Sequence, residues 1–200
     1  MAYRARASAM LMTPDEFLVY PLSDVKAELV RGELLVTPPP GGPHGRAATN
    51  LVVLLSIHVK AHQLGSVFGD GVGYELAQLP HTVRVPDASF VRADRLPVGG
   101  LGPGLLKLAP DLAIEVLSPS ERASELEQKL HDYRTCGTPL IWVLDPVQRT
   151  VMVVANNSPL HWLREVDSLD GADVVPGFSC CVSELFEGIA LLTSLSAPDC

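Results

Sequence analysis

Three segments of the chain have the apolar spacing or the end signals of helices. In 46–65, apolar residues recur every three or four positions, which predicts a long and largely buried helix. The segment 121–137 predicts a second helix, with Ser120 as its N-cap. A short helix is expected after Thr13, because Glu16 follows three residues later and completes a capping box.

Runs of apolar residues bounded by turn residues predict strands between and after these helices. They lie on both sides of Gly32 in 27–40, and at 66–76, 82–91, 111–119, 140–146 and 150–157. Because a helix separates 111–119 from 140–146, we expect these two strands to be parallel, with a right-handed crossover. The earlier strands suggest antiparallel pairs. The pattern predicts an α/β fold, a single domain with a central mixed β-sheet flanked by α-helices.

The composition is that of an acidic protein. The chain has 200 residues, a formal net charge of −8 and a pI near 5.1. This charge argues against holding nucleic acid by electrostatics alone, because such binding depends on clustered Lys and Arg. No apolar run is long enough to span a membrane, and the four cysteines lack the spacing of a zinc site. We therefore expect reduced thiols and a cytoplasmic protein.

One charged residue stands inside the most apolar of the predicted strands. In the run DLAIEVLSPS, Glu115 lies between Ile114 and Val116. A buried carboxylate without a partner is costly, so it normally has a cationic partner, a metal ion or a raised pKa. A salt bridge to a core arginine is the structural alternative.

Further charged residues lie beside or within segments where a sequence that forms only a core would have apolar residues. Asp87 follows the apolar run TVRVP, Glu28 opens the strand ELVRGELLV, and His44 lies in a glycine-rich loop before the long helix. Glu125 and Lys129 share a face of the second helix. Taken alone, each residue has a structural explanation. Asp87 is typical of a turn residue, and Glu28 of a solvated residue at a strand edge. His44 suits an exposed loop, and Glu125 with Lys129 an ordinary helical ion pair.

Together these side chains suit a site for a hard cation. Mg²⁺ prefers oxygen ligands and is commonly held by one or two carboxylates, with water and substrate phosphate completing its shell. Such an ion polarises a phosphoryl oxygen and makes a bound water nucleophilic, and a nearby lysine stabilises the developing charge. By spacing alone, the set is suggestive of phosphodiester hydrolysis but not specific for it.

The order of several motifs resembles the Uma-two family of restriction endonucleases, in the PD-(D/E)XK nuclease superfamily. The motifs are TPDEFL, AELVRGELLVTPPP, PHGR, VRVPDASFV, DLAIEVLSPS and EQKLHDYRTCGTPLIWVLDP. The resemblance covers the range 12–190, which would form the domain, and leaves 1–11 and 191–200 as tails. It implies a restriction-endonuclease-like fold with a divalent-metal site where a strand bends.

The resemblance also implies roles for individual residues. Asp87 matches the aspartate of the PD motif and Glu115 the acid of the second half-motif, and both would bind metal. Glu28 matches an early acid on the opposite side of the site. His44 matches a loop histidine that would contact metal, water or phosphate.

One position departs from the wider superfamily. The superfamily usually has a lysine two residues after the second acid, where this chain has Leu117. The family instead supplies a lysine from the following helix, and Lys129 matches it. A lysine reaches a site from either position because its stem is long and flexible.

The leading hypothesis is an endonuclease that uses Mg²⁺ or Mn²⁺ to hydrolyse phosphodiester bonds of DNA through a metal-bound water. The residues expected to carry it are Asp87, Glu115 and His44 at the metal, with Lys129 and Glu28 completing the catalytic set. The alternative is a catalytically weak or inactive nuclease-fold protein that acts in binding or assembly, which the acidity favours. Hydrolysis of another phosphate compound is a third reading. A homodimer is expected by analogy with nucleases that cut both strands.

Overall fold

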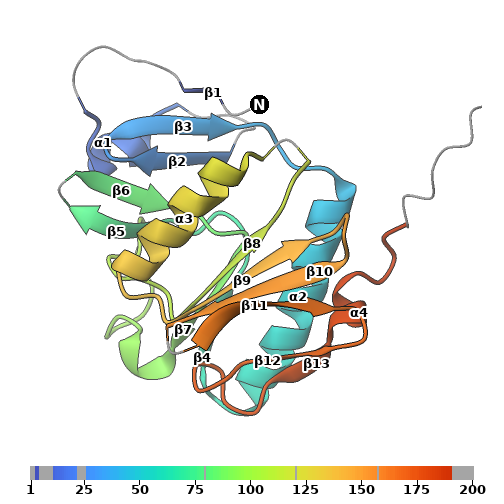
Figure 1. Cartoon of the computed structure of the whole chain (residues 1–200). Helices are drawn as coiled ribbons and strands as arrows, with labels where there is room; N and C mark the ends of the chain where they lie inside the picture. The colour runs from blue at the N-terminus through green and yellow to red at the C-terminus, as the bar shows by residue number, and fades with distance from the viewer. Residues whose placement is uncertain are drawn as a thin grey trace, which may run out of the picture.

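The strands of the computed structural model form two main sheets and one small pair (Figure 1). The structure describes residues 3–4, 11–21, 26–78, 80–119, 121–156 and 158–190. Within them, the first sheet is antiparallel and has five strands, in the order β1 (Tyr3–Arg4), β3 (Glu33–Thr37), β2 (Lys26–Val30), β6 (His81–Arg84) and β5 (Tyr74–Gln78). The second has six, in the order β11 (Ser158–Arg164), β10 (Thr150–Ala155), β9 (Leu140–Asp145), β8 (Leu112–Val116), β7 (Ala88–Arg92) and β4 (Gly65–Phe68). The small pair is β12 (Ser168–Asp170) with β13 (Ser179–Cys181).

The six-stranded sheet is mixed. Strands β8 and β9 are parallel, and helix α3 (Ala123–Thr135) connects them. The other neighbouring strands of this sheet run antiparallel. The parallel pair predicted from the sequence is therefore confirmed, and so is the α/β fold with a mixed sheet flanked by helices.

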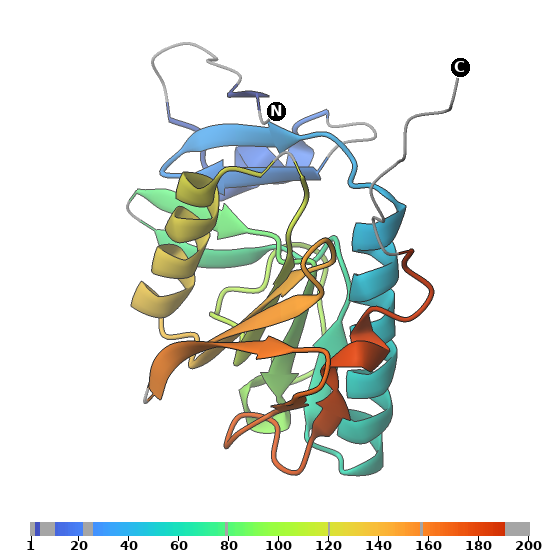
Figure 2. The ribbon, with the colours of Figure 1, turned by 45° about the vertical axis from the view of Figure 1, so that its right-hand side comes forward.

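Alternation along β8 divides its side chains between two helices. Leu112 and Ile114 belong to the core cluster that includes helix α2 (Gly42–Ala61), whereas Ala113 packs with Tyr133 of α3. Figure 2 shows α2 and α3 on opposite sides of the six-stranded sheet. Because successive strand residues point to opposite faces, Glu115 points to the α3 side. The strand thus presents its carboxylate to α3.

Two predicted strands turn out to be pairs of strands in different sheets. The segment 66–76 contains most of β4 and the start of β5, and 82–91 contains most of β6 and β7. The second break falls at Val85, Pro86 and Asp87. Proline has no N–H to give to a ladder, so it ends pairing there. Both predictions of a single strand were wrong. In 82–91 the apolar pattern continues across the break, whereas in 66–76 the glycine-rich run 69–73 separates the two strands.

The helices differ from the predictions mainly at their starts. Helix α2 begins at Gly42, because Pro43 suits the first turn of a helix, and this places His44 in the helix rather than in the predicted loop. Helix α3 begins after Arg122, and the predicted cap, Ser120, lies outside the described residues. The capping box of Thr13 with Glu16 is confirmed at the start of α1 (Pro14–Val19).

The remaining elements are short. Arg31 and Gly32 both have positive φ and form the tight turn between β2 and β3, as the strands predicted around Gly32 require. A 3₁₀ turn (Ala93–Arg95) follows β7, and α4 (Val182–Leu185) follows β13. In the described part of the chain, no helix is long and apolar enough to cross a membrane.

The predicted tails and thiols are only partly described. In the range 1–11, Tyr3 and Arg4 form β1, which pairs with β3, whereas 191–200 lies outside the described residues. The structure has free thiols at Cys136, Cys180 and Cys181, in agreement with the prediction, and Cys200 is not among the described residues.

Candidate functional site

Asp87 lies at the break between β6 and β7, where the chain passes from one sheet to the other. Its Oδ1 accepts a hydrogen bond of 2.5 Å from Lys26 Nζ. Its Oδ2 accepts one of 2.7 Å from the backbone N–H of Val116 and lies 3.1 Å from His44 Nε2. Burial raises the pKa of the Asp87 carboxyl, but His44 and Lys26 outweigh burial and hold that pKa well below its usual range. Asp87 is therefore a buried anion.

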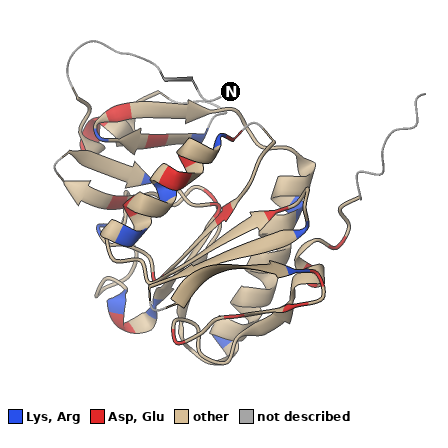
Figure 3. Cartoon of the chain, in the orientation of Figure 1, with Lys and Arg blue, Asp and Glu red and all other residues tan. Residues whose placement is uncertain are grey.

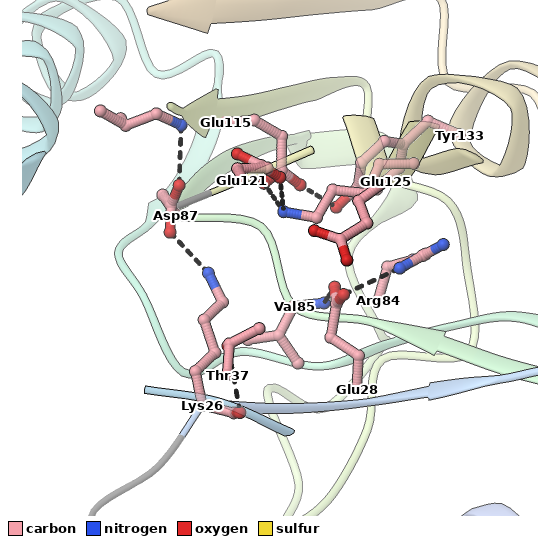
Figure 4. A network of polar contacts seen from close by, with 12 residues as sticks. Lys26, Glu28, Thr37, Arg84, Val85, Asp87, Glu115, Glu121, Glu125 and Tyr133 are labelled. Carbon is pink, nitrogen blue, oxygen red and sulfur yellow. Dashed lines mark hydrogen bonds and ion pairs between the residues drawn. The ribbon is translucent and has the colours of Figure 1, made fainter. Parts of the chain in front are cut away.

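Glu115 is fully buried and has two partners on α3 (Figure 4). Its Oε1 accepts a hydrogen bond of 2.8 Å from the Tyr133 hydroxyl, and its Oε2 accepts one of 2.8 Å from Lys129 Nζ. Lys129 and Tyr133 are four residues apart, so they share the face of α3 that meets β8. Burial raises the pKa of Glu115 in spite of the Lys129 charge. The cationic partner is thus a lysine, not the core arginine considered as the alternative.

Lys129 links Glu115 to the loop before α3. Its Nζ also lies 3.0 Å from Glu121 Oε1. Burial lowers the pKa of Lys129, but the carboxylates of Glu115, Glu28 and Glu121 raise it well above the usual value. Glu125, expected as a helical partner of Lys129, instead accepts a hydrogen bond from the backbone N–H of Arg122 at the start of α3.

Glu28 belongs to a buried ion-pair cluster, which excludes the solvated strand edge. Its Oε2 accepts a hydrogen bond of 2.8 Å from Arg84 Nη1, and its Oε1 accepts one of 2.9 Å from the backbone N–H of Val85. The same guanidinium donates to Asp132 Oδ2 through Nε and Nη2, at 2.9 and 2.6 Å. Burial raises the pKa of Glu28, but Arg84, the two lysines Lys129 and Lys26 and the N–H of Val85 together outweigh burial, and the pKa lies below the usual value. The cluster joins β2, β6 and α3.

A cavity of about 230 Å³ brings the predicted site residues together. Asp87, Glu28, His44 and Lys129 all line it. Glu115, the fifth predicted residue, is fully buried and contacts the Nζ atom of Lys129. In the part of the chain that the structure describes, no three His, Cys, Asp or Glu side chains are arranged to hold a metal ion by themselves.

Charge is unevenly distributed around this cavity. Figure 3 shows that α3 carries several acidic and basic residues beside the five-stranded sheet, whereas the six-stranded sheet is mostly uncharged. Four carboxylates line the cavity, from Glu28, Asp87, Glu121 and Glu125, against two ammonium groups, from Lys26 and Lys129. The wall therefore has an excess of negative charge, which suits a cationic occupant.

His44 lies in the first turn of α2 and faces Asp87 with Nε2. Its other ring nitrogen, Nδ1, is buried and has no hydrogen-bond partner within the described residues. The ring is therefore positioned by one hydrogen bond only, and the alternative of an exposed loop residue is wrong.

Three further residues were missed by the sequence reasoning. Lys26 lies two residues before Glu28, so strand alternation puts both on one face of β2. Arg84 is a charge in the apolar run TVRVP, which is the same signal that drew attention to Glu115. Tyr133 is the tyrosine of the K-x-x-x-Y pattern, and its helical spacing from Lys129 indicates a shared partner.

Comparisons with known proteins bear on the fold and the family of the chain. The crystal structure of "a putative nuclease belonging to DUF820" from Anabaena variabilis ATCC 29413 matches with a TM-score of 0.77 and 23% sequence identity, over 88% of this chain and 97% of that one. At this identity the similarity shows the fold. No curated protein matches the chain. The model of the Uma2 (Uma-two) family, described as "Putative restriction endonuclease", matches residues 14–183. The chain therefore belongs to the Uma2 family.

Proposed function

We propose that this protein is a nuclease that hydrolyses phosphodiester bonds of DNA with the help of Mg²⁺ or Mn²⁺. The observation that carries the proposal is the meeting of Asp87, Lys129, His44 and Glu28 at one cavity, with Glu115 directly behind Lys129. Membership of a family described as restriction endonucleases supports DNA as the substrate.

The donor set fits a loosely held hard cation. Asp87, just before β7, lines the cavity, and Glu115 lies behind Lys129 on the neighbouring strand β8. Their carboxylates would be the metal ligands, and His44 faces Asp87. Mg²⁺ commonly takes one or two carboxylates from a protein and the rest of its shell from water and phosphate. The absence of a three-residue ligand cage among the described residues is compatible with this mode of binding. When bound, the metal would polarise a phosphoryl oxygen and supply a nucleophilic water.

The charge of the cavity supports a requirement for the cation. A phosphodiester is an anion, and the carboxylates of the wall outnumber the ammonium groups. Like charges at short range repel, so substrate needs a cation between its phosphate and these carboxylates. The protein's acidity, which argues against binding DNA by charge alone, thus agrees with a compact metal-dependent site.

Lys129 has an electrostatic role in this proposal, and His44 and Glu28 have positioning roles. Lys129 is a charged ammonium at the cavity wall and would stabilise negative charge that develops on the phosphoryl group. His44 holds the Asp87 carboxylate from the side of α2. Glu28 accepts hydrogen bonds from Arg84 and from the backbone of Val85. It therefore fixes the position of the chain just before Asp87.

The test is cleavage of single-stranded, double-stranded and branched DNA with Mn²⁺, by the wild-type protein and by Glu115→Gln and Asp87→Asn. We expect both substitutions to remove cleavage while the proteins remain folded by circular dichroism. Glu127→Gln is the matched control, because Glu127 is exposed on α3. Cleavage that is equal in all four proteins would show a contaminant and refute the proposal.

A second candidate function is binding or assembly without catalysis. The observation in its favour is that Asp87 and Glu115 each already have a lysine partner, so their charges are balanced without a metal. This candidate predicts DNA binding that neither EDTA nor Mn²⁺ changes, measured by fluorescence anisotropy. The nuclease proposal predicts binding of uncleavable phosphorothioate DNA that strengthens with the metal.

We further propose that the protein is cytoplasmic and forms a homodimer. Strand β11 is an edge of the six-stranded sheet, and its Trp162 is 52% exposed, next to the half-exposed Leu160. An exposed edge with large apolar side chains is a surface that a second copy can cover. Light scattering should give the mass of a dimer, and Trp162→Glu should give that of a monomer.

A further inference from the structure

The ammonium group of Lys26 is bound to the Asp87 carboxylate at the wall of the proposed metal site. Its side chain reaches from β2 to Asp87, as Figure 4 shows, and is 15% exposed. The Nζ atom lies 2.5 Å from Asp87 Oδ1 and 3.3 Å from Asp70 Oδ1. The two acceptors differ in environment, because Asp87 is 4% exposed and Asp70 is 56% exposed. One ammonium group therefore lies between a buried and an exposed carboxylate.

A cation and this ammonium compete for the same oxygen. Asp87 Oδ2 already has Val116 N–H and His44 as partners. Among the described residues, Oδ1 has Lys26 alone as partner, and a cation would replace it there. Two positive charges at one oxygen repel strongly at the edge of a low-dielectric site. The lysine stem has several rotatable bonds, so its head can move without a change in the backbone.

We propose that Lys26 is an exchangeable counter-ion of Asp87, which holds the carboxylate in place until a divalent cation displaces the ammonium group toward Asp70. This rests on the proposed function, because it assumes a cation at Asp87. Asp70 is the acceptor to which the ammonium group would move. The backbone N–H of Gly71 donates to Asp70 Oδ1 and holds this carboxylate in position. Asp70 lines a neighbouring cavity, which Lys26 also lines.

The first test follows the reactivity of the Lys26 amine in the wild-type protein. The protein is treated with an amine-acylating reagent with and without saturating Mn²⁺, and each lysine is quantified by mass spectrometry. Loss of the buried carboxylate partner is expected to raise the labelling rate of Lys26 by about tenfold, the change that one pKa unit gives. Lys60, exposed near the end of α2, is the internal reference and should not change.

The second test measures Mn²⁺ affinity by calorimetry in Lys26→Met, Asp70→Asn and the double variant. Lys26→Met should bind Mn²⁺ about tenfold more tightly, because no ammonium has to be displaced. Asp70→Asn should weaken binding in the presence of Lys26 and have a smaller effect in the Lys26→Met background. This coupling distinguishes exchange from simple repulsion, since repulsion alone would give additive effects.

The outcomes separate this inference from the proposed function. If the wild-type protein binds Mn²⁺ but the labelling of Lys26 does not rise, Lys26 is a fixed structural partner and the inference fails while the metal site stands. Additive effects of the two substitutions would overturn it in the same way. If the wild-type protein binds neither Mn²⁺ nor Mg²⁺, the proposed function fails and the inference fails with it.

Discussion

The ammonium group of Lys129 lies 2.8 Å from Glu115 Oε2, and this contact joins α3 to the middle of the six-stranded sheet. Glu115 is fully buried and the Lys129 side chain is only 14% exposed, so the charge of each depends on the other. Removal of one partner from a buried pair leaves an uncompensated charge, which is far costlier than the pair itself is stabilising. The contact therefore determines how substitutions at this site affect folding as well as chemistry.

We expect Lys129→Met to lower the free energy of unfolding by about 3 to 5 kcal/mol, the usual cost of leaving a buried charge unpaired. Urea denaturation at neutral pH measures it. The double variant Glu115→Gln with Lys129→Met should recover much of this loss, because neither charge remains. Lys60→Met, on the exposed face of α2, should change stability by no more than about 0.5 kcal/mol. A Lys129→Met protein as stable as the wild type would contradict the buried pair.

Tyr133→Phe tests the other hydrogen bond of Glu115. The ring stays in the core between Ala113 and Ile141, but Glu115 Oε1 loses its donor. We expect a loss of about 1 to 3 kcal/mol, the cost of leaving a buried acceptor unsatisfied, from urea denaturation. Cleavage of DNA should fall but not disappear, because Lys129 still holds the other oxygen. Thr135→Val, which removes a hydroxyl near the end of the same helix, is a control that should leave cleavage unchanged.

The sequence predicted much of the fold because its strongest signals are local. The parallel pair β8 and β9 follows from a strand, a capped helix and a strand in succession. The division of 82–91 between two sheets was not predicted, because apolar alternation continues through Pro86. Which sheet a strand joins depends on contacts between distant residues, and a single sequence does not contain those contacts in readable form.

The acids of the candidate site and Lys129 were predicted from the sequence, but the cations Lys26 and Arg84 were not. Glu115 and Asp87 were visible because a carboxylate is out of place in an apolar run. Lys26 compensates Asp87 and Arg84 compensates Glu28, across sequence separations of 61 and 56 residues. Such pairings depend on which strands become neighbours and on how the two sheets meet, so spacing along the chain does not indicate them.

The pair of Glu28 and Arg84 should make stability depend on acid pH. The pKa of Glu28 is lower in the folded protein than its ordinary value, which is about 4.3. The ionised form therefore stabilises the fold above that pH, and the contribution is lost as the pH falls through the folded pKa. At pH 7, Glu28→Gln should cost about 1 to 3 kcal/mol, because Arg84 loses one anionic partner and keeps Asp132.

Urea denaturation between pH 7 and pH 3 checks this dependence. The difference in unfolding free energy between the wild type and Glu28→Gln should shrink as the solution becomes acidic. The unfolding free energy of Glu127→Gln, a substitution at an exposed position of α3, should follow that of the wild type at every pH. A difference that stays constant down to pH 3 would mean that Glu28 contributes packing alone, and the ion-pair interpretation would have to be abandoned.

Binding of a divalent cation should appear as stabilisation of the folded state. A ligand that binds only the folded protein, at 100 times its dissociation constant, raises the free energy of unfolding by about 2.7 kcal/mol. We expect Mn²⁺ to do so for the wild type and EDTA to reverse it, in urea denaturation monitored by tryptophan fluorescence. Asp87→Asn should abolish the effect, because it removes an anionic ligand while an oxygen remains for the N–H of Val116. Asp94→Asn, exposed after β7, should retain the full effect, so equal responses of the two variants would place the cation elsewhere.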